Sequence, residues 1–293
     1  MVSAEKNPSG YIPPDEFYYG DPKDDLFYGT MLKGPGARCG PEFNGNIAGK
    51  GYTEQYAFMQ KTPAFLALSS PKNFALASAE GLSASKADPV VARALGSGVS
   101  PQQMMFWMTE LSDILMLDYI FNQQDRPGNI DHRWVWYYID SSGRLQSSTV
   151  DSEAGRPAMA SLAAPPEVKS SPKTFLIQKI QVNDNDAGGR RYTNFTKKFG
   201  LLEKIHHLSP IAYRQLIRLA NDFQGKGPFY KYFSTTFNMS DAYIGTIAQN
   251  AVQAAQILKA TCKSGSMNFD LAPESYLASG QVEAIRVDCD NPQ

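Results

Sequence analysis

Two carboxylates and one amide in this chain have the types and spacing to do chemistry: Asp125, Asn129 and Asp151. Asp125 and Asn129 lie in the polar segment NQQDRPGN, and Asp151 follows an apolar run further along the chain. A carboxylate such as Asp125 can orient an attacking hydroxyl and take its proton. An amide and a second carboxylate can hold the divalent ion that bridges nucleotide phosphates. These residue types in this order predict phosphoryl transfer.

The element before Asp125 is predicted to be a buried helix. Ser100, Pro101 and Gln103 match a helix N-cap, a first-turn proline and a capping-box partner. Across residues 104–121, apolar side chains fall on nearly every face, which is typical of a helix that is buried all round. Such a helix would give Asp125 a rigid base.

A β-hairpin is predicted directly before Asp151. Residues 133–139 are almost all aromatic or β-branched, and residues 140–143 (DSSG) have turn chemistry. Residues 145–150 then resume a strand. Asp151 is therefore expected just past a strand end.

The N-terminal quarter offers weaker signals. Residues 1–24 are rich in Pro, Gly, Asp and Tyr and are expected to form an irregular arm. Residues 26–33 are expected to form a strand that ends in Lys33, and a short helix is expected to begin near Glu54.

A second hairpin and a hinge are predicted next. Residues 65–69 and 74–78 are two apolar runs separated by the turn-forming sequence SPKN. Residues 78–88 are small and polar, which suits a hinge between two lobes.

Beyond Asp151 the chain is predicted to be mostly helical. Residues 155–190 are rich in Ala, Pro and Ser and are expected to form a long loop that crosses the site. Helices are expected over residues 210–223 and 240–262, each opened by a serine. Residues 263–293 are expected to be mostly irregular.

Composition limits the class of protein. The chain has 293 residues, of which 42% are hydrophobic and 19% charged, as is ordinary for a soluble globular protein with one large core or two lobes. A net charge of -1 argues against capture of nucleic acid by bulk electrostatics. Acidic residues interrupt the predicted buried helix, so we expect no transmembrane segment.

The cysteines do not indicate the cellular compartment of the protein. Cys39, Cys262 and Cys289 lack the paired spacing of a zinc site, so one disulfide with a free thiol and three reduced thiols are both compatible with the sequence. No apolar signal region follows Met1. A cytoplasmic protein and a secretory-pathway protein given without its targeting segment both fit.

The order of these parts resembles the protein-kinase superfamily. The segment NQQDRPGN resembles the NxDRHxxN loop of its atypical branch, which comprises the HipA-type bacterial kinases, the phosphatidylinositol kinases and the Fam20-type secretory-pathway kinases. The resemblance spans roughly residues 26–262. It implies that Asp125 is the catalytic aspartate and that Asn129 and Asp151 bind the metal.

The resemblance also implies a nucleotide site for ATP with Mg²⁺ or Mn²⁺. Lys33 would grip the phosphates and Glu54 would anchor Lys33. The adenine would lie against the backbone of residues 77–82, which include Ala79, Glu80 and Leu82.

The implied architecture is an α+β, bilobal kinase-like fold. It would consist of the arm (1–24), a small β-rich lobe (25–82), a larger helical lobe with the catalytic loop and the hairpin (83–262), and a C-terminal extension (263–293). The expected acceptor is a Ser or Thr hydroxyl on a protein. A lipid or small-molecule acceptor and transfer of AMP are alternatives, and no nucleic-acid partner is expected.

Two other classes of protein fit the same residues. Pro127 stands where many relatives have histidine, Asn129 comes one residue early, and no clear Gly-rich phosphate loop precedes Lys33. These departures favour a pseudokinase, which binds without turnover. In an unrelated α+β protein, the loop would be turn chemistry alone, and Asp125 and Asp151 would lie far apart.

Overall fold

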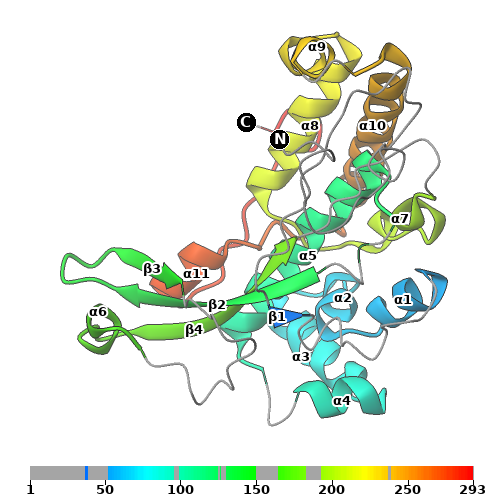
Figure 1. Cartoon of the computed structure of the whole chain (residues 1–293). Helices are drawn as coiled ribbons and strands as arrows, with labels where there is room; N and C mark the ends of the chain where they lie inside the picture. Colours follow the sequence, from blue (N-terminus) through cyan, green and yellow to red (C-terminus); the bar gives the residue numbers. More distant parts are fainter. Residues whose placement is uncertain are drawn as a thin grey trace, which may run out of the picture.

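The computed structural model describes residues 37–38, 52–95, 99–124, 126, 130–149, 164–182, 193–236 and 239–292. Helices make up most of this part of the chain, and one antiparallel sheet lies at its side (Figure 1). The expected α+β class is confirmed.

The helices are distributed along the whole described chain. In order they are α1 (Tyr52–Met59), α2 (Pro63–Leu68), α3 (Phe74–Ser85), α4 (Pro89–Leu95), α5 (Pro101–Phe121), α6 (Pro166–Lys169), α7 (Phe195–Lys198), α8 (Pro210–Gln224), α9 (Pro228–Thr235), α10 (Asp241–Lys263) and α11 (Pro273–Ser279), with a 3-10 turn, η6, at Leu202–Lys204. The predicted helices over residues 104–121, 210–223 and 240–262 are confirmed as α5, α8 and α10.

Helix α5 is the central element, as its apolar faces predicted. Ser100 caps it by accepting a hydrogen bond from the Gln103 backbone N–H, and Pro101 occupies its first turn. The Gln103 side chain, however, does not complete a capping box. It exchanges two 2.8 Å hydrogen bonds with the backbone of Gln178 and so ties α5 to the sheet.

One hydrophobic core joins the helices on both sides of α5. It contains Tyr56 and Leu68 from the N-terminal helices, Met108 from α5, and Tyr213 and Leu258 from α8 and α10. Residues from both sides of the expected lobe boundary at residue 82 therefore share this core.

The predicted hairpin over residues 65–78 is wrong, because these residues form the helices α2 and α3. Short apolar runs do not by themselves distinguish a strand from a buried helix. Here the caps decide: Pro63 occupies the first turn of α2, and the Asn73 side chain accepts a hydrogen bond from Leu76 N–H to start α3. The two helices pack closely at Gly81, where a Cβ would lie 2.6 Å from the Pro63 carbonyl oxygen.

The sheet is built around one long strand. Its strands are β1 (Ala37–Arg38), β2 (Ile130–Ile139), β3 (Leu145–Thr149) and β4 (Thr174–Val182). β4 pairs along one edge of β2 from Ile130 to Tyr138. The other edge is shared, because β1 pairs with β2 at residues 131–132 and β3 pairs at residues 135–139. All the pairs are antiparallel.

The hairpin of β2 and β3 confirms the prediction made from residues 133–150. Its turn is closed by Asp140, whose carboxylate accepts hydrogen bonds from Ser142 N–H at 2.9 Å and Arg144 N–H at 3.0 Å. Gly143 supplies the positive φ of 79° that the turn needs.

The prediction of a structureless loop over residues 155–190 is wrong for its described part. That part contains α6 and the nine-residue strand β4. The sequence TFLIQKIQV is rich in β-branched and aromatic residues, and it pairs with β2 along the edge opposite β1 and β3.

The C-terminal segment after α10 is irregular apart from α11, as expected. A disulfide joins Cys262 at the end of α10 to Cys289. Of the alternatives left open for the cysteines, the structure has the one with a disulfide. None of the helices in the described ranges has the length and hydropathy required to cross a bilayer.

Candidate functional site

The C-terminal end of α5 is held by two asparagines from distant parts of the chain. Asn122 ends the helix in the left-handed region, with φ 55°. The Asn194 amide donates to Tyr119 O at 2.7 Å and to Asn122 Oδ1 at 2.8 Å. The Asn250 amide donates to Ile120 O at 3.2 Å and to Asn122 Oδ1 at 2.9 Å. Carbonyls that a helix end leaves unpaired are thus satisfied, and the start of the predicted catalytic loop is fixed.

A buried ion pair ties Arg126 to α5. Arg126 donates from Nε and Nη2 to the carboxylate of Asp118 at 2.8–3.1 Å, and their side chains are only 5% and 1% exposed. Burial raises the pKa of Asp118, and the Arg126 guanidinium opposes that rise. Because leaving either partner unpaired would cost about 3–5 kcal/mol, Arg126 is locked to the last turn of α5. Asp118 is one of three acidic residues in the mainly apolar sequence of α5, and Arg126 follows it shortly after the helix ends.

Four predicted site residues lie outside the described residues: Lys33, Asp125, Asn129 and Asp151. The immediate neighbours of Asp125, Gln124 and Arg126, are described. The elements next to these four residues in the sequence are β1, α5, β2 and β3.

The pairing of the strands shows which strand end lies next to the start of β2. Ile130, the first residue of β2, pairs with Val182, the last residue of β4. Cα atoms of such directly opposite residues lie about 4.5–5.5 Å apart. The chain therefore enters β2 from the predicted loop beside the point where it leaves β4.

The strand that leads to Asp151 ends elsewhere. Thr149, the last residue of β3, pairs with Val135, which lies five residues from Ile130 along β2. That separation is about 17 Å in an extended strand. The intervening edge of β2 is occupied at residues 131–132 by β1, so β3 lies toward the far end of the sheet from the loop (Figure 1).

A different pair of carboxylates follows β4 in the sequence. The residues after Val182 are Asn183, Asp184, Asn185 and Asp186, which also lie outside the described residues. They were not among the predicted site residues, because residues 155–190 were expected to form a loop. The β-branched run before this polar NDND segment was the signal that could have found them.

The residues predicted to hold the nucleotide base are helical. Ala79, Glu80 and Leu82 lie in α3, where backbone N–H and C=O groups are used within the helix. Glu80 is exposed and pairs with Lys72. This backbone offers no free edge to an adenine, contrary to the expectation. Glu54 lies exposed in the first turn of α1, where its charge favours the helix dipole.

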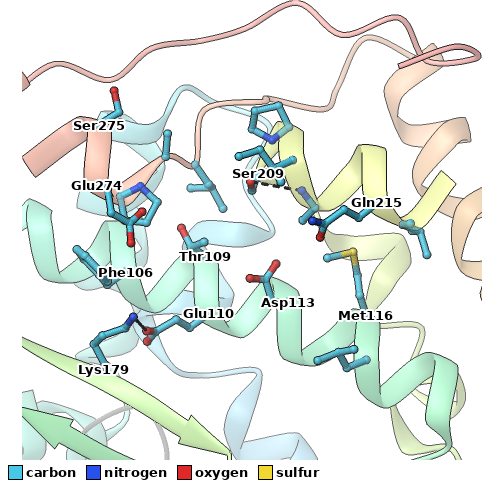
Figure 2. Close-up of a pocket in the computed structure, with 18 of the residues that line it drawn as sticks. Phe106, Thr109, Glu110, Asp113, Met116, Lys179, Ser209, Gln215, Glu274 and Ser275 are labelled. Carbon is cyan, nitrogen blue, oxygen red and sulfur yellow. Dashed lines mark hydrogen bonds and ion pairs between the residues drawn. The ribbon is translucent and has the colours of Figure 1, made fainter. Parts of the chain in front are cut away.

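A pocket also lies along α5. It has a volume of about 710 Å³ and is enclosed by α5, α8, β4 and the segment leading into α11 (Figure 2). Most of its lining is apolar. Within it Lys179 pairs with Glu110 at 3.6 Å, and Glu110 also accepts a 2.7 Å hydrogen bond from Ile180 N–H. Burial raises the pKa of Asp113 to about 6.

No group of three or more His, Cys, Asp or Glu side chains that could hold a metal occurs among the described residues. Comparisons of the chain with protein-family models, with curated proteins and with solved structures find no match.

Proposed function

We propose that the protein is an ATP-dependent phosphotransferase of the atypical kinase-like type, in which the loop after α5 meets the end of β4. The observation that carries this proposal is the pairing of Ile130 with Val182, directly beside a loop that Arg126 locks to α5. A carboxylate that directly precedes the tethered Arg126 in the sequence, together with a strand end that carboxylates follow in the sequence, suits metal-assisted phosphoryl transfer.

In this proposal Asp125 orients the acceptor hydroxyl and takes its proton, and Asn129 binds the metal. The metal carboxylate is assigned to Asp184 or Asp186 in preference to Asp151. The register supports this choice, because the described end of β4 lies beside Ile130 and the described end of β3 lies five residues away along β2.

ATP with Mg²⁺ or Mn²⁺ remains the proposed cofactor, and a protein Ser or Thr hydroxyl the proposed acceptor. Lys33 is proposed to bind the phosphates, with Glu54 as its proposed anchor. The bilobal architecture of the kinase superfamily is part of the same proposal.

The test is intact-mass spectrometry of the purified chain after incubation with ATP and Mn²⁺, together with measurement of ATP consumption. The parent should gain phosphoryl groups or consume ATP. Asp125→Asn should lower the rate by roughly 100-fold or more, as expected for loss of a general base. One of Asp184→Asn and Asp186→Asn should do the same, while Asp151→Asn should keep most of the activity.

Loss of activity in Asp151→Asn alone would return the metal role to Asp151. Addition of AMP in place of phosphate would change the reaction to nucleotidyl transfer. A parent that neither consumes ATP nor gains mass would contradict the proposed turnover.

A second candidate is a pseudokinase, a binding module without turnover. The one-residue-shorter spacing from Asp125 to Asn129 and the lack of a clear Gly-rich phosphate loop before Lys33 in the sequence favour it. A thermal shift with Mg²⁺-ATP, in a parent that shows no phosphate transfer, would support this candidate.

A further inference from the structure

One stripe of α5 lines the pocket. Thr109, Asp113, Met116 and Ile120 recur at helical spacing on this stripe, and α8 faces them across the space. Figure 2 shows Asp113 projecting from α5 toward the side where Ser209 and Gln215 lie. This stripe thus carries one carboxylate, that of Asp113, between less polar residues.

The carboxylate of Asp113 has an oxygen atom that accepts no hydrogen bond from the described residues. Its Oδ1 atom is inaccessible to solvent, and no hydrogen-bond partner for it occurs among the described residues. A buried polar atom without a partner is costly, so few remain in folded proteins unless a ligand or water satisfies them.

The other charged residues of the lining do not neutralise Asp113. The ammonium group of Lys179 pairs with Glu110. Glu274, at the start of α11, adds a third carboxylate near the solvent. Three carboxylates and one ammonium group line the pocket, so its described surface favours a cation.

We propose that this pocket binds a small organic cation, with a protonated amine against Asp113 and an apolar body along α5 and α8. A volume of about 710 Å³ falls in the range of small-molecule sites. Leu216 and Leu271 supply apolar surface for the body of the ligand, and the carboxylate of Asp113, which lines the pocket, supplies the negative charge that attracts an ammonium group. This proposal is independent of the phosphotransferase proposal.

The experiment compares three probes with the same eight-carbon chain: octylamine, octanol and octanoate. Their affinities for the full chain are measured by isothermal titration calorimetry at pH 7.5, below the concentrations at which the probes aggregate. Octylamine should bind roughly tenfold or more tightly than octanol, because its ammonium group makes a charge-assisted hydrogen bond. Octanoate should bind most weakly, because its charge has the same sign as that of Asp113.

Asp113→Asn is the decisive variant, since it keeps the shape of the side chain and removes its charge. Octylamine affinity should fall to that of octanol, and octanol affinity should not change. Glu283→Gln, which removes an exposed carboxylate that is not part of the pocket lining, should leave the affinities for all three probes as in the parent.

The affinity for octylamine should also rise with pH through about 6, where Asp113 ionises. Glu110, Lys179 and Glu274 are the other charged groups that line the pocket. The pH dependence should therefore disappear in Asp113→Asn. Equal affinities for the three probes, no binding of octylamine, or octylamine binding that survives Asp113→Asn would each overturn the proposal.

Discussion

Asp113 and Asp118 lie five residues apart on α5, but only Asp118 is paired with a positively charged side chain among the described residues. Asp118 meets the Arg126 guanidinium through two nitrogen atoms. Asp113 has an inaccessible oxygen with no described hydrogen-bond donor, and burial alone raises its pKa. Asp118 therefore holds Arg126 against α5, while the buried charge of Asp113 destabilises the protein and lies at the wall of the pocket.

Replacing Asp113 by asparagine should stabilise the protein near neutral pH. The pKa of Asp113 is raised from 3.8 to about 6, so the folded state binds the proton more tightly than the unfolded state. Stability from this group is present at low pH and is lost as pH rises from about 4 to about 6. With a discount for partial exposure, the loss is about 1–2 kcal/mol.

Urea denaturation of the parent and of Asp113→Asn across pH 4 to 8 measures this effect. The difference in unfolding free energy between them should be small near pH 4 and reach its full value above pH 7. Two curves that stay parallel over this range would show that Asp113 has an ordinary pKa.

The packing of α2 against α3 depends on the absence of a side chain at one position. A Cβ on Gly81 would approach Pro63 O to 2.6 Å, Ala67 N to 2.8 Å and Ala67 Cβ to 2.9 Å. Two of these atoms are backbone, so relief requires the helices to move apart. Gly245 in α10 is the contrasting case, since nothing lies within 4 Å of its Cβ position.

Alanine should therefore have opposite effects at these two helical glycines. Gly81→Ala should lower the unfolding free energy by about 1–3 kcal/mol through overpacking. Gly245→Ala should raise it by roughly 0.5–1 kcal/mol, because alanine has the better helix propensity. Chemical denaturation of both variants measures the contrast. Stabilisation by Gly81→Ala would mean that α2 and α3 are not in close contact.

The C-terminal segment is tied back onto the helical core at several points. Cys289 forms the disulfide with Cys262, and its carbonyl accepts a 2.8 Å hydrogen bond from Tyr213 OH. Asp290 pairs with Lys259 and Lys263 of α10. An irregular segment of this length has little secondary structure of its own, so these links give it a fixed path.

Reducing the disulfide should destabilise the protein by about 3–4 kcal/mol in the chain-entropy account, given a sequence separation of 27 residues. Denaturation with and without dithiothreitol measures this difference. The double variant Cys262→Ser/Cys289→Ser should behave like the reduced parent and should not respond to dithiothreitol. A parent with the same stability in both conditions would indicate that the bond contributes nothing.

Local sequence signals were enough to predict several helices and strands. The caps at Ser100, Ser209 and Ser240 each precede a helix as predicted, because a capping side chain bonds to backbone only three residues away. The hairpin of β2 and β3 was predictable for the same reason, since its turn and both strands are contiguous in the sequence.

The remaining choices depend on contacts between distant residues. Apolar runs at residues 65–69 and 74–78 suit a strand or a helix, and packing at Gly81 favours two helices. For the candidate site, the sequence supplied a loop and several carboxylates that could serve it. Only the pairing of β2 with β4 places the end of β4 opposite the start of β2, because register is set by burial and hydrogen bonds across the sheet. The pocket around Asp113 likewise exists only where α5, α8 and the approach to α11 come together.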